Sequence, residues 1–272
     1  MFSIIKRKKP LHVRFLTKRD KLADLFPPQR LSKETPNWWK NTPLFLPPFN
    51  STNSPSLRSN KINTIKNLRK SSKHCYAIQE TFKHAINFPL WSDAYVEVDH
   101  KDAVSSYAPG KANSNDGRGF GEQHPKQQYP NLLPDNYCNF KFNSVWLAIT
   151  EEYVPFWMCD PFYNKFNRDW QTMNGVIEFH YQHNLNVNLI LRKPLPPKKN
   201  QKEQKIQYEF RAGDSIAYLV PMAHDRKLII TAEQVTEKEW DRLHWQHHIW
   251  FHHHKGMKKH NQGGCPITIG GV

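Results

Sequence analysis

Gly175-Val-Ile-Glu-Phe-His-Tyr181 leads into Leu185-Asn-Val-Asn-Leu-Ile-Leu191, where apolar residues alternate with Asn before the run becomes fully apolar. This alternation is typical of a strand that buries one face. Pro194-Leu-Pro-Pro197 ends the strand, and the charged residues 198–205 that follow are typical of a solvated hairpin loop. These features predict β structure in the middle of the chain.

The stretch Arg211-Ala-Gly-Asp-Ser-Ile-Ala-Tyr-Leu-Val-Pro221 extends the β pattern toward the C-terminus. Residues 206–210 alternate again, Gly213-Asp214 predicts a turn, and residues 215–220 predict another strand. Further strands are expected at residues 94–98, 140–149 and 153–158.

Composition limits the class of protein. The chain has 272 residues, of which 38% are hydrophobic, so it can bury a substantial core. Its four cysteines are far apart and none forms a Cys-x-x-Cys pair, which indicates neither a zinc site nor a disulfide framework. No run of apolar residues approaches the length of a membrane span, and we expect a soluble protein without a membrane partner.

Positive charge is concentrated in the first quarter of the chain. Residues 1–73 hold 17 Lys and Arg against 3 Asp and Glu, whereas the remainder holds 22 against 21. Such an arm suits nucleic acid or an acidic protein surface, although a solvated tail has the same composition. The candidate contact residues are Lys6, Arg7, Lys8, Lys9, Arg14, Lys18, Arg19, Lys66, Arg69 and Lys70, with Trp38 and Trp39. The two tryptophans either stack on bases or anchor the arm to the rest of the protein.

The chain divides into three regions at changes in composition. Residues 1–73 are expected to be a basic N-terminal arm with a short strand at 11–16 and a short helix at 18–26. Residues 74–235 form the β domain, in which the Gly-, Asn- and Pro-rich residues 100–136 are a long loop. Residues 236–272 hold one helix and a Gly-rich tail, because Thr236-Glu-Lys-Glu239 fits a capping box.

Histidines follow the expected C-terminal helix. His244, His248 and His252 recur at every fourth position, and such imidazoles on one helix face can share a metal ion. The Glu of a His-Glu-x-x-His site is missing, so a solvated or interface face is the alternative reading. We therefore expect no cofactor.

Two of the quoted stretches resemble motifs of the dUTPase and dCTP deaminase superfamily, which has a β-clip barrel. The match covers Gly175-Val-Ile-Glu-Phe-His-Tyr181 and Gly213-Asp-Ser-Ile-Ala217. Glu178 stands where the family has the Asp that activates water, and Tyr181 matches the residue that packs on the sugar. No Arg stands near Phe142-Asn-Ser-Val145, where the family holds the triphosphate. The resemblance implies the fold more than the activity.

Residues 11–235 as a whole resemble an uncharacterised family of proteins from marine tailed bacteriophages, which has bacterial relatives. The resemblance rests on Pro36-Asn-Trp-Trp-Lys-Asn-Thr-Pro43, Pro89-Leu-Trp-Ser-Asp93, Glu122-Gln-His-Pro-Lys-Gln127, Lys141-Phe-Asn-Ser-Val-Trp146, Asn174-Gly-Val-Ile177, Asn184-Leu-Asn-Val-Asn188 and Gly213-Asp-Ser-Ile-Ala-Tyr-Leu-Val-Pro-Met222. It implies a viral context and no particular reaction.

These observations predict a mainly β protein: one distorted barrel or sandwich, β-clip-like or jelly-roll-like, with a basic N-terminal arm and one C-terminal helix. We expect a non-enzymatic virion protein that uses its termini to bind other viral structural proteins or packaged DNA. It would occupy the host cytoplasm before assembly and be part of an oligomer afterwards. The alternatives are a dUTPase-like enzyme or pseudoenzyme using Glu178 and Tyr181, and a nonspecific nucleic-acid binder.

Overall fold

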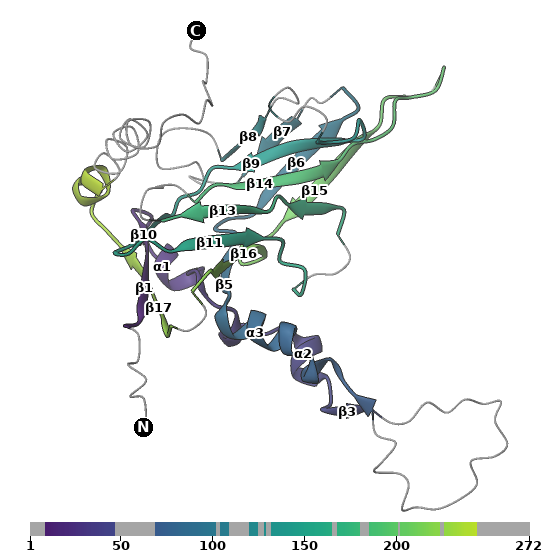
Figure 1. Cartoon of the computed structure of the whole chain (residues 1–272). Coiled ribbons are helices and arrows are strands. Elements are labelled where there is room, and N and C mark those ends of the chain that lie inside the picture. The colour runs from purple at the N-terminus through teal and green to yellow at the C-terminus, as the bar shows by residue number, and fades with distance from the viewer. Residues whose placement is uncertain are drawn as a thin grey trace, which may run out of the picture.

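The computed structural model describes residues 9–46, 69–101, 104–108, 120–124, 128, 132–164, 168–179, 185–200, 202–223 and 226–243. These residues are mainly β, and their sheets pack in a sandwich-like arrangement (Figure 1). The predicted fold class is confirmed. Among the described strands the sheets stay open and do not close into a barrel.

The described strands form four sheets and one two-stranded ribbon. The first sheet contains β10 (Leu147–Thr150), β1 (Leu11–Thr17) and β17 (Leu228–Gln234). The second contains β13 (Gly175–Glu178), β11 (Pro155–Cys159), β16 (Ser215–Pro221), β5 (Ile86–Pro89) and β2 (Gln29–Arg30). The third contains β12 (Trp170–Thr172), β14 (Val187–Arg192), β9 (Tyr137–Phe142) and β8 (Gly121–His124). The fourth contains β15 (Lys205–Phe210), β6 (Ala94–Asp99) and β7 (Val104–Tyr107), and the ribbon pairs β3 (Phe45–Leu46) with β4 (Arg69–Lys70).

Short helices connect and cover these sheets. They are α1 (Leu22–Leu25), η1 (Leu31–Lys33), α2 (Asn37–Asn41), η3 (Ser72–His74) and α3 (Tyr76–His84). Residues 237–243 are also helical, and the Thr236 hydroxyl accepts a hydrogen bond from the Glu239 backbone N–H at 3.2 Å. The expected helix start is therefore confirmed.

The alternation that predicted the central strands corresponds to real burial. In β14 the side chains of Val187, Leu189 and Leu191 are buried, whereas Asn188 between them is partly exposed. Gly213, at the predicted turn before β16, has a φ of +87°, a conformation that glycine adopts at little cost.

Strand β1 is a core strand, although it lies in the segment expected to be an arm. It pairs antiparallel with β10 and parallel with β17, so it lies between residues far away in sequence. Its side chains Val13 and Phe15 belong to the main hydrophobic cluster. The strand and short helix predicted here are present, but residues 11–31 pack with the β-sheets instead of extending away from them.

Two parts of the β domain differ from their predicted form. Residues 100–136, expected to be a loop, contribute β7 and β8, whose Gly-, Ser- and Gln-rich sequences lack an apolar alternation. Residues 140–149, expected to be one strand, are split between β9 and β10 in different sheets. The chain changes sheet at Asn143-Ser144, where the Ser144 backbone N–H donates to the Asn186 side chain at 2.9 Å.

Ion pairs join the basic N-terminal segment to the acidic end of the described chain. Arg14 donates to Glu233 at 2.9 Å, and Lys18 lies 3.1 Å from Glu237. Nearby, Leu16 and Trp240 are buried in a small cluster of their own. Part of the excess charge of the N-terminal segment is therefore matched within the protein.

Replacing Glu233 with Gln should lower the free energy of unfolding by less than about 1 kcal/mol near pH 7, because the pair is exposed to solvent. The hydrogen bond from Arg14 lowers the pKa of Glu233 from its ordinary value of 4.5. The contribution is therefore complete above pH 4.5 and is lost as the pH falls through the lowered pKa. Urea denaturation of both proteins at neutral and acidic pH should show the difference shrinking in acid; a difference independent of pH would contradict this account.

Candidate functional site

A polar cleft lies between the starts of α2, β12 and β16. It encloses about 460 Å³. The residues that line it are Glu34, Thr35, Pro36, Asn37, Trp38, Asn164, Trp170, Gly213, Asp214 and Ser215. They combine two carboxylates, two amides, two hydroxyls and two indoles, and none of them carries a positive charge.

Trp38 forms one aromatic wall of this cleft. Its indole N–H donates to the Tyr163 carbonyl at 2.7 Å, and its ring contacts Trp39, Phe82 and Tyr163. The side chain remains 40% exposed. Trp38 is therefore held in place by its neighbours while part of the ring stays available. Trp39 packs against Phe82 at a ring distance of 4.8 Å.

A buried ion pair supports the second aromatic wall. The Arg168 guanidinium binds the Asp160 carboxylate and lies 4.3 Å from the centre of the Trp170 ring. The other carboxylate oxygen of Asp160 accepts the Thr172 backbone N–H at 2.8 Å. Burial lowers the pKa of Arg168, and its Nη1 has no hydrogen-bond partner among the described residues. This arrangement fixes Trp170 in the wall of the cleft.

The amide of Asn164 is held between two hydroxyl groups. It donates to the Ser215 hydroxyl and accepts from the Tyr218 hydroxyl at 2.7 Å. Burial raises the pKa of Tyr218, so the phenol stays protonated and remains a donor. Burial also raises the pKa of the nearby Cys159 thiol to about 11, which keeps it in its unreactive neutral form.

The turn that carries Asp214 is fixed by the stretch 89–93. The Gly213 N–H donates to the Leu90 carbonyl, and the Leu90 N–H donates to the Asp214 carbonyl, both at 2.8 Å. The Asp93 carboxylate accepts the Ala212 N–H at 2.8 Å. Stretches 36–43, 89–93 and 213–222, quoted separately in the sequence, thus meet at one place. Asp160, Arg168 and Trp170 carry no sequence motif, and their contribution emerges only from the fold.

The dUTPase-like residues are not brought together. Glu178 pairs with Pro155 at one end of β11, where it accepts a hydrogen bond from the Tyr153 hydroxyl at 2.6 Å. Ser215 lies beyond the other end of β11, roughly 20 Å away along the strands. A phosphate group beside Glu178 would need a nearby arginine. Arg168 and Arg211 lie instead at the Ser215 end of β11, and Arg192 is at the end of β14 in another sheet. Tyr181 lies outside the described residues.

The predicted basic contact residues have different surroundings. Arg14 and Lys18 are paired with carboxylates, and burial lowers the pKa of Arg19. Lys70 is exposed in the β3–β4 ribbon, next to the backbone of Arg69. Several of the predicted contact and metal-binding residues lie outside the described part of the chain: Lys6, Arg7, Lys8, Lys66, His244, His248 and His252. The side chain of Arg69 also lies outside it.

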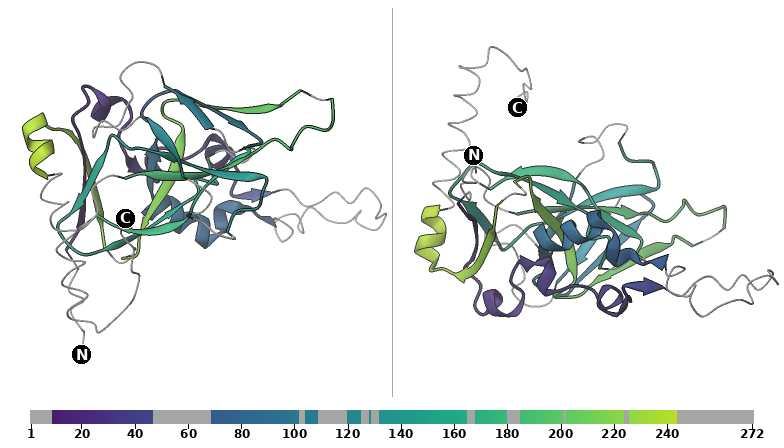
Figure 2. Two further views of the ribbon diagram at one scale, coloured as in Figure 1. Left: turned by 90° about the horizontal axis from the view of Figure 1, so that it is seen from above. Right: turned by 60° about the horizontal axis from the view of Figure 1, so that its bottom comes forward.

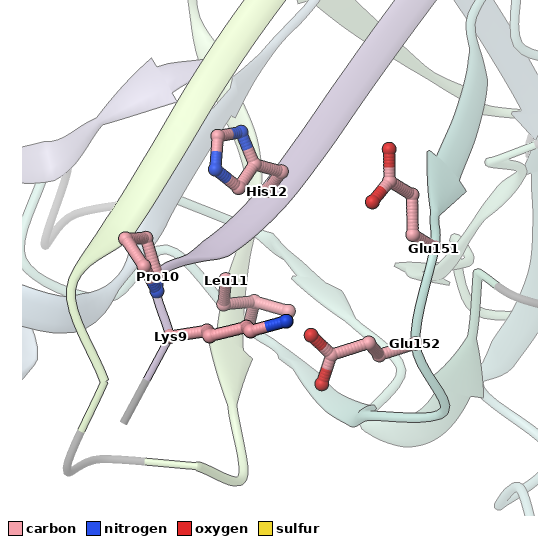
Figure 3. A pocket seen from close by; sticks show the side chains of 6 residues that line it. All are labelled: Lys9, Pro10, Leu11, His12, Glu151 and Glu152. Atoms are coloured by element: carbon pink, nitrogen blue, oxygen red, sulfur yellow. The ribbon is translucent and has the colours of Figure 1, made fainter. Parts of the chain in front are cut away.

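Lys9 lies beside a smaller cleft of about 190 Å³ at the start of β1 (Figure 3). Figure 3 shows its ammonium group directed toward Glu152, with His12 and Glu151 farther along the cleft. Behind this cleft, Arg226 donates to the carbonyls of Lys9 and Pro10 and to both carboxylate oxygens of Glu152. These bonds fix the start of β1 to the β10–β11 turn.

A lobe formed by residues 37–46 and 69–84 stands out from the sheets, with β3 at its far end (Figures 1 and 2). Phe82 of α3 anchors the lobe by packing with Leu31 and Tyr218. Several apolar side chains of the lobe are exposed, among them Leu44 (59%), Phe45 (46%) and Tyr76 (74%). Lys40, Lys70 and Lys73 give the same lobe positive charge.

Comparison with protein-family models, curated proteins and solved structures finds no match for this chain. Within the described ranges, no helix is long and apolar enough to cross a membrane. The same residues contain no group of three or more His, Cys, Asp or Glu side chains arranged to hold a metal ion.

Proposed function

We propose that this protein is a non-enzymatic structural or assembly component of a bacteriophage particle, and that its lobe binds a neighbouring protein subunit. The observation that carries the proposal is the lobe, which presents exposed apolar side chains at the far end of a segment that is itself anchored in the core. The resemblance of residues 11–235 to phage proteins supplies the viral context.

The apolar surface of the lobe favours a protein partner. Leu44, Phe45 and Leu46 are consecutive and all exposed, and contiguous apolar surface of this kind marks interaction sites on soluble proteins. In the described part of the chain, β3 and β4 pair only with each other and with no further strand. A strand from a neighbour can add to such an edge through main-chain hydrogen bonds.

Charge adds a preference for an acidic protein surface. Lys40 and Lys70 are exposed on the lobe, and Lys73 donates to the Lys40 carbonyl at 3.2 Å. Positive side chains around an apolar contact increase the association rate with an acidic partner more than they increase affinity. Packaged DNA would use the same lysines but would leave the exposed leucines without a role.

The separation of Glu178 from Ser215 favours binding over nucleotide hydrolysis. A dUTPase-like site needs a base, a sugar platform and phosphate-binding cations around one cavity. Here Glu178 and Arg168 lie at opposite ends of β11. Turnover of dUTP or dCTP with Mg²⁺ by the purified full-length protein would overturn this part of the proposal.

Replacing Leu44 and Leu46 with Ser should reduce incorporation of the protein into particles by tenfold or more, because each buried leucine contributes about 1.5–3 kcal/mol at an interface. The matched control is Leu195→Ser, since Leu195 is 72% exposed in the connection between β14 and β15. Quantitative mass spectrometry of purified particles gives the copy number, and thermal unfolding verifies that both variants fold.

Normal incorporation of the lobe variant would contradict the proposal for the lobe. Equal loss in the Leu195 control would contradict it as well, because the effect would then not be specific to the lobe. Substitutions that remove the charge of Lys40 and Lys70 are the further comparison. If they abolish incorporation while the Leu44 and Leu46 variant assembles normally, the partner is DNA or another polyanion, and the proposed protein interface is overturned.

A further inference from the structure

The cleft between α2, β12 and β16 has a chemistry that the proposed function does not use. Its polar groups are the carboxylates of Glu34 and Asp214, the amides of Asn37 and Asn164 and the hydroxyls of Thr35 and Ser215. No Lys, Arg or His is among its described lining residues. We propose that this cleft binds a neutral, hydroxyl-rich ring of the pyranose class found in glycans.

The absence of positive charge among the described lining residues selects against anionic ligands. Nucleotides and phosphorylated sugars need cationic or backbone N–H partners, and two carboxylates in the same cleft repel them. Hydroxyl groups, by contrast, donate to carboxylates in charge-assisted hydrogen bonds of about twice the strength of neutral ones. The amides of Asn37 and Asn164 supply both donors and acceptors for the remaining hydroxyls.

The exposed indole of Trp38 provides the apolar contact that a sugar ring requires. One face of a pyranose carries C–H groups, which pack on the surface of an aromatic ring. Trp38 is held by its hydrogen bond to Tyr163 and by ring contacts, so binding costs little ordering of this side chain. The cleft volume of about 460 Å³ lies within the range of small-ligand sites.

The polar side chains of the cleft are already fixed. Glu34 accepts hydrogen bonds from Gln29 and Asn87, and Asn164 is held by Ser215 and Tyr218. Asp214 accepts the Arg211 N–H at 3.2 Å within its turn. These contacts orient the polar groups before a ligand arrives. Such prior ordering is a property of binding sites rather than of ordinary surface.

Calorimetry and tryptophan fluorescence with the full-length protein test the proposal, using maltose, cellobiose, lactose and N,N′-diacetylchitobiose as probes. At least one disaccharide should bind with a Kd of about 1 mM or tighter. Trp38→Leu and Asp214→Asn should each weaken binding about tenfold or more. Trp157→Leu is the matched control, because Trp157 is 43% exposed, against 40% for Trp38, and lies outside this cleft.

Three outcomes overturn the proposal. They are no binding of any probe at ten times the expected Kd of about 1 mM, a loss of affinity in the Trp157 variant equal to that in the Trp38 variant, or tighter binding of deoxyuridine or dUMP than of every disaccharide. Thermal unfolding of each variant separates loss of the site from loss of the fold. Sugar binding by the cleft does not depend on incorporation of the protein into particles. The sugar-binding proposal and the proposed particle role can therefore fail independently of each other.

Discussion

Replacing Asp160 with Ala should lower the free energy of unfolding by about 3–5 kcal/mol, because the substitution leaves the Arg168 guanidinium buried without its counter-charge. The Arg168 side chain is 6% exposed and that of Asp160 22% exposed. The Thr172 N–H also loses its acceptor. Chemical denaturation of the purified variant measures the change.

An exposed ion pair between Glu97 and Lys205 is the control for the pair of Asp160 and Arg168. The carboxylate of Glu97 lies 2.6 Å from the ammonium group of Lys205, and both side chains are exposed. Glu97→Ala should cost no more than about 1 kcal/mol. Adding Arg168→Leu to Asp160→Ala should recover part of the loss, because the unpaired charge is then removed. If the Asp160 variant loses less than about 1 kcal/mol of unfolding free energy, the ion pair does not behave as a buried one, and this prediction is wrong.

Phe15→Ala should lower the free energy of unfolding by a similar amount, about 3–5 kcal/mol, since it opens a cavity in the main core. Phe15 is 0% exposed and its ring lies 6.2 Å from that of Phe179. Phe162 is 52% exposed, so Phe162→Ala makes the same chemical change at the surface and should cost far less. Equal effects of the two substitutions would mean that β1 is not part of the core.

Most of the strands that were predicted correctly have residues that alternate along the chain. In β6 and β14 the period of two is present in the sequence itself, because one face of each strand meets the core. Strand β16 was predicted instead from an apolar run after a Gly-Asp turn, and residues 216–219 of this strand are buried on both faces. Strands β7 and β8 escaped prediction because Val104-Ser-Ser-Tyr107 and Gly121-Glu-Gln-His124 show no such period. Their pairing with β6 and β9 supplies what their own sequences lack.

Contacts between residues far apart in sequence explain the other differences between the predicted and the observed structure. The parallel pairing of β1 with β17 joins Leu11 to Leu228, and no local pattern reports which strand will be a neighbour. Charge alone indicated an arm, yet Arg14 and Lys18 face Glu233 and Glu237. Two of the basic residues in this segment, Arg14 and Lys18, therefore have carboxylate neighbours within the same chain.

The candidate cleft was predictable only in part. Trp38 and the turn at Gly213-Asp214 were recognised from the sequence, because aromatic pairs and Gly turns are visible there. The network of Asp160, Arg168 and Trp170 was not, since a buried ion pair depends on which strands become neighbours. Glu178 was selected by a local resemblance, and its distance from Ser215 depends on the pairing of β11 with β13 and β16.

The proposed role in a bacteriophage particle is tested by quantitative mass spectrometry of purified particles. If the lobe binds a neighbouring subunit, the full-length protein is present in a fixed number of copies per particle and stays bound through high-salt washing, because apolar contacts of the lobe are not screened by salt. Absence of the protein from purified particles, or its complete release by salt, would contradict the proposed role.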